Sequence, residues 1–258
     1  MTFEWIRLRL RFRAAGSLVL PPGKAANVLR GALGMLLDEA VFAPKSSAGP
    51  SGLADAPRPF VLRAAHLDGR AIPPETEFHF DVHLFDTGRE FRRQFATAFS
   101  GWKRAELLAV EEQPGMVDFA GPPESAARVR VQFLTPTELK SDRQLVTRPD
   151  FPILFARLRD RISTLRALYG PGPLDIDFRA AAERAARVRL ARCEIAWQHV
   201  ERRSTRTGQT HPLGGFTGEA EYDGELGEFL PYLRAGQWTG VGRQTVWGKG
   251  EICSQVCS

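Results

Sequence analysis

Residues 240–250, GVGRQTVWGKG, place two cations among glycines near the end of the 258-residue chain. The cations are Arg243 and Lys249, and the glycines are Gly240, Gly242, Gly248 and Gly250. Because glycine has no Cβ, such a loop can bring backbone N–H groups and cations close to a phosphodiester. A dinucleotide-binding loop follows a strand and opens a helix, whereas here we expect a helix before the loop and a strand after it. The segment therefore predicts an anion-binding loop of another kind.

The five histidines are the other candidates for chemistry. His79 and His83 lie on one face of an expected strand, about 13 Å apart at their Cα atoms for a rise of about 3.3 Å per residue. They cannot both bind one ion unaided, so we predict no metal site and no cofactor. His199 and His211 flank the segment ERRSTRTGQT, and each is either a solvated loop residue or a group that acts on an anionic partner. His66 is expected in a surface turn.

The charge of the chain is unevenly distributed. The net charge is +5, and residues 1–124 hold 15 basic and 15 acidic side chains, so the whole excess lies in residues 125–258. The stretch 179–206 holds eight Arg and three Glu, with Arg202, Arg203 and Arg206 in an expected hairpin loop. This asymmetry favours an anionic partner.

Composition excludes several classes of protein. The chain is 43% apolar and 25% charged, and no apolar run approaches the roughly 18–20 residues that cross a bilayer. Its first residues, MTFEWIRLRLRFRA, alternate charged and apolar side chains, unlike a signal peptide. Three cysteines are too few for a disulfide framework. We therefore expect a cytoplasmic protein with reduced thiols and no membrane contact.

The order of expected elements is the same in the two halves. In the first half we predict strands at 3–13, 60–63 and 77–85, helices at 24–42 and 88–101, and a hairpin of 104–112 with 116–120 around Pro114-Gly115. In the second half we predict strands at 128–133, 187–200 and 213–223, helices at 151–169, 178–186 and 225–235, and a short last strand. The order β-α-β-β-α-β, found twice, predicts an α+β protein of two tandem ferredoxin-like domains with antiparallel sheets, residues 1–124 and 125–258. The arginine-bearing faces of 3–13 and 128–133 would lie on the open sides of the sheets.

The chain resembles the CRISPR-associated endoribonucleases that process precursor RNA, the Cas Six family of the RAMP superfamily. The resemblance rests on LGGFTGEAEY at 213–222, ELGEFLPYLRAGQW at 225–238 and GVGRQTVWGKG at 240–250. LRGALGMLLDEAVF at 29–42 and the stretch 58–86 also match the general pattern. It implies cleavage of CRISPR repeat RNA without a metal ion, by attack of a ribose 2′-OH on the adjacent phosphate. The products would carry a 2′,3′-cyclic phosphate and a 5′-OH.

The family often has a histidine on or just after the first helix, but residues 24–60 hold no His and no Tyr. We therefore take His211, His199 and Lys45 as catalytic candidates. The RNA-binding candidates are Arg30, Arg202, Arg203, Arg206, Gly240, Gly242, Arg243, Gly248, Lys249 and Gly250. The expected partner is CRISPR repeat RNA, with other CRISPR subunits or a second copy of the chain as further partners. The alternative function is an inactive RAMP subunit that binds crRNA in an interference complex.

Overall fold

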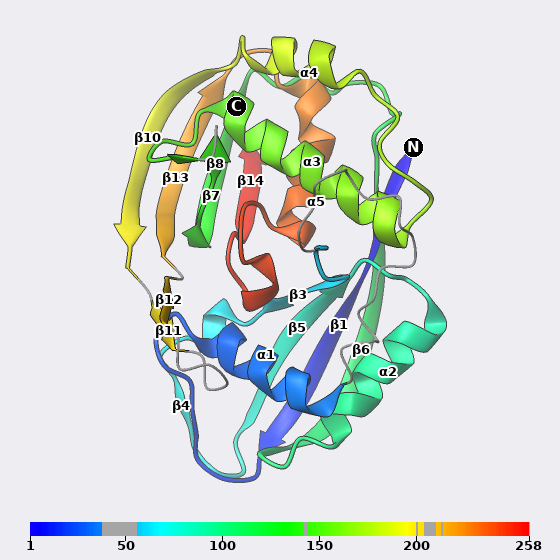
Figure 1. The fold of residues 1–258 in the computed structure, drawn as a ribbon, viewed down its shortest axis with the longest axis vertical. Helices are drawn as coiled ribbons and strands as arrows, with labels where there is room; N and C mark the ends of the chain where they lie inside the picture. The colour runs from blue at the N-terminus through cyan, green and yellow to red at the C-terminus, as the bar shows by residue number, and fades with distance from the viewer. Residues whose placement is uncertain (38–55, 142–143, 200, 204–209, 213, 258) are drawn as a thin grey trace.

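Two four-stranded sheets form the framework of the protein (Figure 1). The computed structural model describes residues 1–37, 56–141, 144–199, 201–203, 210–212 and 214–257, and at 201–203 and 210–212 it describes the backbone. Within each sheet every pair of neighbouring strands is antiparallel. The predicted α+β class with tandem ferredoxin-like sheets is confirmed.

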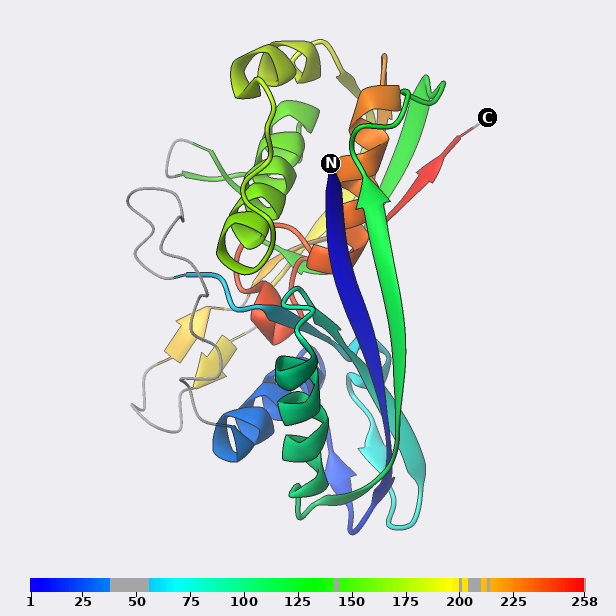
Figure 2. The ribbon, with the colours of Figure 1, turned by 90° about the vertical axis from the view of Figure 1, so that its right-hand side faces the viewer.

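The first sheet has the strand order β3-β5-β1-β6. Its strands are β1 (Thr2–Ala14), β3 (Phe60–Arg63), β5 (Glu77–Leu84) and β6 (Ala105–Asp118). Helices α1 (Ala25–Leu36) and α2 (Arg89–Ser100) cover one face (Figure 2). A small ribbon of β2 (Leu18–Val19) and β4 (Ala71–Ile72) and a 3₁₀ turn at Ala65–Leu67 complete this half.

The second sheet repeats the same order as β10-β13-β7-β14. Its strands are β7 (Arg128–Thr137), β10 (Arg189–Gln198), β13 (Gly215–Asp223) and β14 (Ile252–Val256), and its helices are α3 (Phe151–Tyr169), α4 (Phe178–Ala185) and α5 (Leu230–Thr239). Two short ribbons project from it, β8 (Lys140–Ser141) with β9 (Gln144–Leu145) and β11 (Glu201–Arg203) with β12 (Thr210–Pro212). The 3₁₀ turns Gly227–Phe229 and Thr245–Trp247 flank α5. The division at residue 124 stays a proposal.

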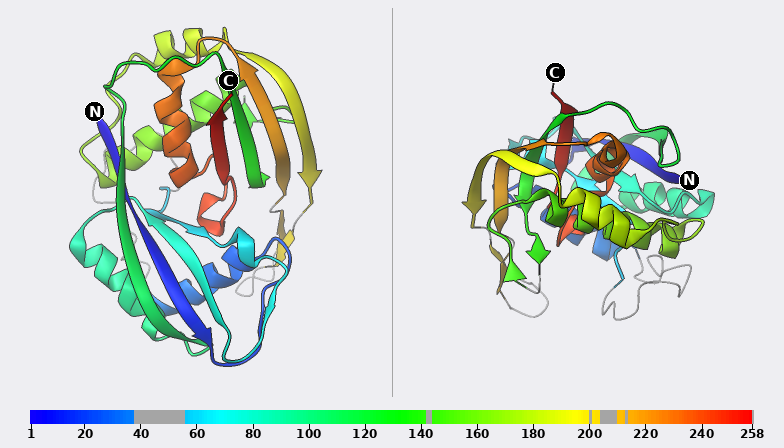
Figure 3. Two further views of the ribbon diagram at one scale, coloured as in Figure 1. Left: turned by 180° about the vertical axis from the view of Figure 1, so that it is seen from behind. Right: turned by 90° about the horizontal axis from the view of Figure 1, so that it is seen from above.

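The halves share part of their cores. The first strand runs with β6 past the end of β5, and there its residues Phe3 and Trp5 pack in the core of the second half. The ring of Trp5 stacks on Trp238 of α5 at a centroid distance of 4.7 Å. Figure 3 shows the N-terminal end of β1 beside α5. Burying large aromatic rings across the junction fixes how the halves sit together.

The predicted hairpin at Pro114-Gly115 is wrong, because β6 continues through both residues and pairs with β1 along its whole length. A proline is tolerated in β6 because the strand lies at the sheet edge, where its missing N–H faces no partner strand. Gly115 lies opposite Trp5, and a Cβ at this position would come within 2.5 Å of the Trp5 ring. The dipeptide therefore makes room for a core tryptophan instead of a turn.

The predicted helix at 225–235 begins too early. A 3₁₀ turn occupies Gly227–Phe229, and α5 runs from Leu230 to Thr239. Pro231 stands in the first turn of α5, where its missing N–H needs no partner. The helix therefore ends directly at Gly240, the first glycine of the glycine-rich loop.

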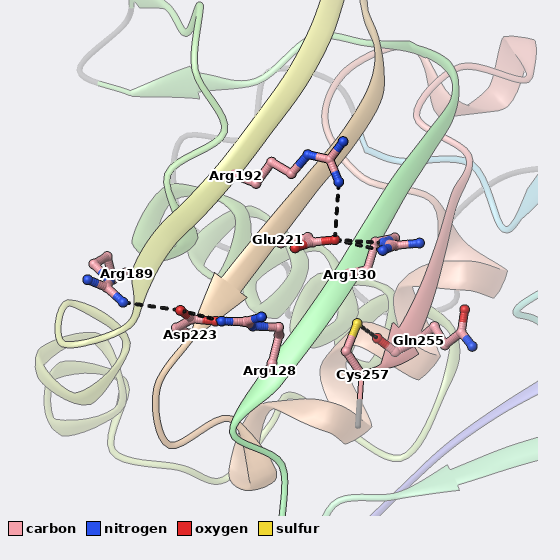
Figure 4. Close-up of polar contacts among 8 residues, drawn as sticks. All are labelled: Arg128, Arg130, Arg189, Arg192, Glu221, Asp223, Gln255 and Cys257. Carbon is pink, nitrogen blue, oxygen red and sulfur yellow. Dashed lines mark hydrogen bonds and ion pairs between the residues drawn. The ribbon is translucent and has the colours of Figure 1, made fainter.

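The open faces of both sheets carry arginines paired with carboxylates. On the second sheet, Arg128 and Arg189 both contact Asp223, at 2.7 and 3.1 Å, and Arg130 and Arg192 both contact Glu221, at 2.7 and 3.9 Å (Figure 4). On the first sheet, Arg9 binds Asp81 at 2.8 Å, Arg11 binds Glu77 at 3.1 Å, and Arg13 lies 3.6 Å from Glu77 and Glu106. Arg192 also binds Glu194 at 2.7 Å, so most of the positive charge in these rows is balanced by carboxylates.

We expect Gly115→Val to destabilise the protein by about 1–3 kcal/mol, because the new side chain must displace the Trp5 ring from the shared core. Urea unfolding at equilibrium measures the change. Gly121→Ala is the matched control, since a Cβ there meets no atom within 4 Å. Equal stability of the two variants would contradict this role for Gly115.

Candidate nucleic-acid interface

The glycine-rich loop, residues 240–250, lies between α5 and β14 and closes on itself. The N–H of Val241 donates to the carbonyl of Gly250 at 2.9 Å, and the N–H of Gly250 donates to the carbonyl of Pro136 at 3.1 Å. A 3₁₀ turn at Thr245–Trp247 fills the middle of the loop and contacts both α1 and β3 of the first half. The loop is thus wedged between the two halves.

The glycines of the loop have packing roles in this fold. A Cβ at Gly248 would lie 2.5 Å from Cβ of Ala26 on α1, and a Cβ at Gly250 would lie 1.9 Å from the carbonyl oxygen of Val241. Both residues have positive φ, +75° and +67°. Gly240, Gly248 and Gly250 are buried and Gly242 is half-buried. RNA contact through their backbone stays a prediction.

Lys249 points into the protein, which corrects the picture of a phosphate-contacting loop lysine. Its side chain is 4% exposed, and Nζ donates to the carbonyl of Gly23 at 3.1 Å, just before α1. Burial lowers the pKa of Lys249, and Asp68 opposes that shift. Asp68 also accepts from the N–H of Ala25 at 2.7 Å. Lys249 therefore ties the loop to the start of α1.

Arg243 is the exposed cation of the loop. Its side chain is 55% exposed, and its guanidinium forms an ion pair with buried Glu138 at 2.5 Å. The backbone N–H of Arg243 donates to the carbonyl of the same Glu138 at 3.1 Å. These two bonds hold the loop on the end of β7 while one side of the guanidinium faces outward.

A cleft of about 540 Å³ opens beside the loop, between the halves of the molecule. Its walls carry four arginines and two aromatic rings: Arg30, Arg58, Arg161, Arg243, Phe60 and Trp247. Arg30 comes from α1 and lies over the Phe60 ring, 5.9 Å from its centroid. Phe60 is fully buried, whereas the ring of Trp247 is half-buried. Arginines beside a partly exposed aromatic ring suit the phosphates and bases of a single-stranded nucleic acid.

The C-terminal end of α5 forms a polar cluster behind the cleft. Arg63 of β3 donates to the carbonyls of Gln237 and Trp238, both at 3.3 Å, and Arg161 of α3 donates through Nε to the carbonyl of Thr239 at 3.0 Å. Burial lowers the pKa of Arg63, and burial together with the nearby charge of Arg63 lowers the pKa of Arg161 to about 9. The guanidinium of Arg161 therefore stays cationic at neutral pH.

His83 belongs to this same cluster and is not a free acid or base. Its Nδ1 lies 3.0 Å from the carbonyl of Trp238, so that Nδ1 carries the proton. Burial, and then the charge of Arg63, lowers the pKa of His83 to about 3. Among the described residues no three His, Cys, Asp or Glu side chains gather as a metal-binding group. No helix in the described part of the chain is long and apolar enough to cross a membrane.

Of the other sequence-predicted site residues outside the glycine-rich loop, His199 is the one whose side chain the structure describes. His199 is exposed after the end of β10 and does not line the cleft. The backbones of Arg202 and His211 face each other in the β11–β12 ribbon, next to Arg203. Lys45 and Arg206 lie outside the described residues.

Two cleft residues, Arg58 and Arg161, are not among the site residues predicted from the sequence. Arg161 lies on a helix with several other arginines, and periodicity shows which face is apolar but not which polar position meets the other half. Arg58 lies outside the expected elements, just before the expected strand at 60–63. One feature of the sequence could have indicated Arg58: it is a cation two residues before Phe60, an aromatic residue at the start of a strand.

We compared the chain with a family model and with solved structures, and both comparisons find CRISPR-associated endoribonucleases. Residues 131–252 match the family model of the CRISPR-associated endoribonuclease Cas6. No curated protein matches the chain. Among solved structures, Thermus thermophilus Cas6 (TTHB231) has a TM-score of 0.60 at 18% identity and 99% coverage of both chains.

The product complex of Cas6 (TTHA0078) has a TM-score of 0.60 at 20% identity, covering 98% of this chain and 99% of that one. A partial Cas6-RT-Cas1–Cas2 complex has a TM-score of 0.66 at 11% identity, covering 98% of this chain and 46% of that one. The protein thus has the tandem ferredoxin-like fold of these structures. Its resemblance to the Cas6 endoribonucleases is confirmed, and the family match lies in the half that carries the glycine-rich loop.

The neutral state of His83 predicts a pH dependence of stability. The unfolded chain takes up a proton below a pKa of about 6.5, whereas folded His83 stays neutral down to about pH 3, so stability falls as the pH falls through this window. Between pH 7 and 5 the loss is about 2 kcal/mol. Urea unfolding at both pH values measures it for the wild type, for His83→Gln and for the exposed control His199→Gln. We expect the loss to shrink in His83→Gln alone, and an unchanged loss there would contradict the assignment.

Proposed function

We propose that this protein is an endoribonuclease that binds and cleaves CRISPR repeat RNA, and so processes precursor crRNA. The observation that carries the proposal is the cleft lined by Arg30, Arg58, Arg161 and Arg243 beside the glycine-rich loop. The segment that matches the Cas6 family model ends just past this loop, at residue 252. A cationic cleft with the half-buried ring of Trp247 in its wall suits an RNA strand, because phosphates need positive charge and unstacked bases stack on aromatic rings.

The proposed reaction is transesterification within the RNA. The 2′-oxygen attacks the adjacent phosphorus as its proton leaves, the P–O5′ bond breaks, and the 5′-oxygen takes up a proton. The products are a 2′,3′-cyclic phosphate and a 5′-OH. The arginines of the cleft would stabilise the extra negative charge on the phosphorane oxygens. Proton transfer needs a separate base and acid, for which Lys45, His199 and His211 remain the candidates.

One observation favours the second candidate function, an RNA-binding subunit without cleavage activity. The described residues that line the cleft include no His, Tyr, Lys, Asp or Glu. Their only ionisable side chains are arginines, which hold a phosphate well but are poor general bases near neutral pH. Under this alternative the protein would retain crRNA in a larger CRISPR complex. We further propose other CRISPR subunits or a second copy of the chain as partners, and a cytoplasmic location.

Incubating the protein with its cognate repeat RNA in EDTA tests the main proposal. We expect cleavage at one position, unaffected by EDTA, and a 3′ end that resists a phosphatase until acid opens its cyclic phosphate. Tight binding without cleavage would contradict the endoribonuclease and support the second candidate function, the RNA-binding subunit. Neither binding nor cleavage would reject both. A repeat with scrambled sequence and equal length is the control for specificity.

The loop cations should differ in their effects on RNA. Arg243→Gln should reduce the salt slope of binding by roughly one phosphate contact, because this side chain is the exposed one. Lys249→Met should leave the slope unchanged and instead lower the unfolding free energy by about 1–3 kcal/mol, because it strands the carbonyl of Gly23. Titrations of labelled RNA at several salt concentrations and urea unfolding separate the two effects. A reduced salt slope in Lys249→Met would contradict this prediction and indicate that Lys249 contacts an RNA phosphate.

A further inference from the structure

Arg161 is fixed at the wall of the cleft by its own helix and by the end of another. Its neighbours on α3, Leu158, Ile162 and Leu165, are buried in the core of the second half, so the helix cannot rotate to move Arg161 away. The Nε–H donates to the carbonyl of Thr239, the last residue of α5. With Nε engaged, the two terminal amino groups of the guanidinium have no hydrogen-bond partner among the described residues and can take another one.

The charge of Arg161 is incompletely balanced. Among the described residues no carboxylate lies within ion-pair distance of it, whereas Arg243 has Glu138. Arg63, which is 6% exposed and lies 4.0 Å from Glu251, adds a further lowering effect on the pKa of Arg161 and gives it no counter-charge. The carbonyls at the end of α5 offer only the partial negative charge of a helix C-terminus, about half an elementary charge. This part of the cleft therefore carries a fixed excess of positive charge.

We propose that Arg161 is the phosphate-holding cation of the cleft, and that its terminal amino groups bind the non-bridging oxygens of one RNA phosphodiester. Guanidinium and phosphate match in geometry, since two parallel N–H bonds reach two oxygens. The fixed orientation lowers the entropy that the side chain loses on binding. This inference rests on the RNA binding of the proposed function, but it does not require cleavage.

Arg157 provides a matched control, because it lies one turn earlier on α3. Its side chain is 43% exposed, pairs with Asp160 at 3.2 Å and does not line the cleft. Replacing either arginine with Gln removes one positive charge from the same helix. A difference between the two variants therefore reports the position of Arg161 and not the net charge of the protein.

The test is the salt dependence of binding to the repeat RNA carrying 2′-O-methyl groups at every position, which cannot be cleaved by transesterification. Losing one phosphate contact should reduce the slope of log K against log salt by about 0.7–0.9 in Arg161→Gln and leave it unchanged in Arg157→Gln. Affinity near 0.1 M salt should fall about tenfold in Arg161→Gln. Wild-type slope and affinity in Arg161→Gln would overturn the proposal.

Arg161→Lys covers the case in which Arg161→Gln does not fold, since it keeps the charge but loses the paired geometry. We expect it to retain the slope and to lose about three- to tenfold in affinity, because a bidentate contact becomes a single one. Unchanged affinity in Arg161→Lys would overturn the bidentate contact. Thermal unfolding checks that each variant is folded.

Unmodified repeat RNA separates this inference from the proposed function. If the wild type binds without cleaving, the nuclease fails while the salt slopes still decide on Arg161. If the wild type cleaves, the single-turnover rate of Arg161→Gln at saturating RNA should fall at least tenfold, and millimolar guanidinium ion should restore part of the rate in Arg161→Gly. If the wild type binds no RNA, both proposals are overturned.

Discussion

The C-terminal end of α5 is the constraint on which the arrangement of the cleft depends. The last three carbonyls of this helix accept hydrogen bonds from Arg63, His83 and Arg161, so that one helix end is satisfied by three separate elements. A helix end buried without such donors would be costly. Two of the donors come from the first half, and the glycine-rich loop begins at the next residue. The same bonds that satisfy the helix therefore also fix the loop against the first half.

Lys249 closes the other end of the same junction. The cation belongs to the loop, and its acceptor, the carbonyl of Gly23, belongs to the turn before α1. The loop is thus attached to the first half at its beginning through α5 and near its end through Lys249. Arg30 on α1 and Arg243 on the loop stand in opposite walls of the cleft. Because buried polar contacts join the loop to the first half, these contacts set the distance between the walls, and the surface arginines do not.

Sequence periodicity predicted the elements well and the contacts between halves poorly. The alternation in β1 and the apolar stripe of α3 depend on local geometry, and both were correctly predicted. The hairpin predicted at Pro114-Gly115 is wrong because, in the sequence, a glycine that makes room for a ring from the neighbouring strand cannot be told from a glycine in a turn. The burial of Lys249 was equally hidden, since its acceptor lies 226 residues away along the chain.

The partners of each arginine separate structural cations from candidate binding groups. Arg128 and Arg130 face Asp223 and Glu221, which they share with Arg189 and Arg192, and Arg192 also binds Glu194. Most of the charge in this row is therefore cancelled by carboxylates. Within the described part of the chain, Arg161 has only helix-end carbonyls for compensation, and dipole charges cancel about half of one unit. A net basic charge attracts RNA from a distance. A phosphate is then held at the cation whose positive charge is least balanced by neighbouring protein groups. By that criterion the position of Arg161, in the wall of the cleft, is favoured over the far more numerous arginines of the sheet faces.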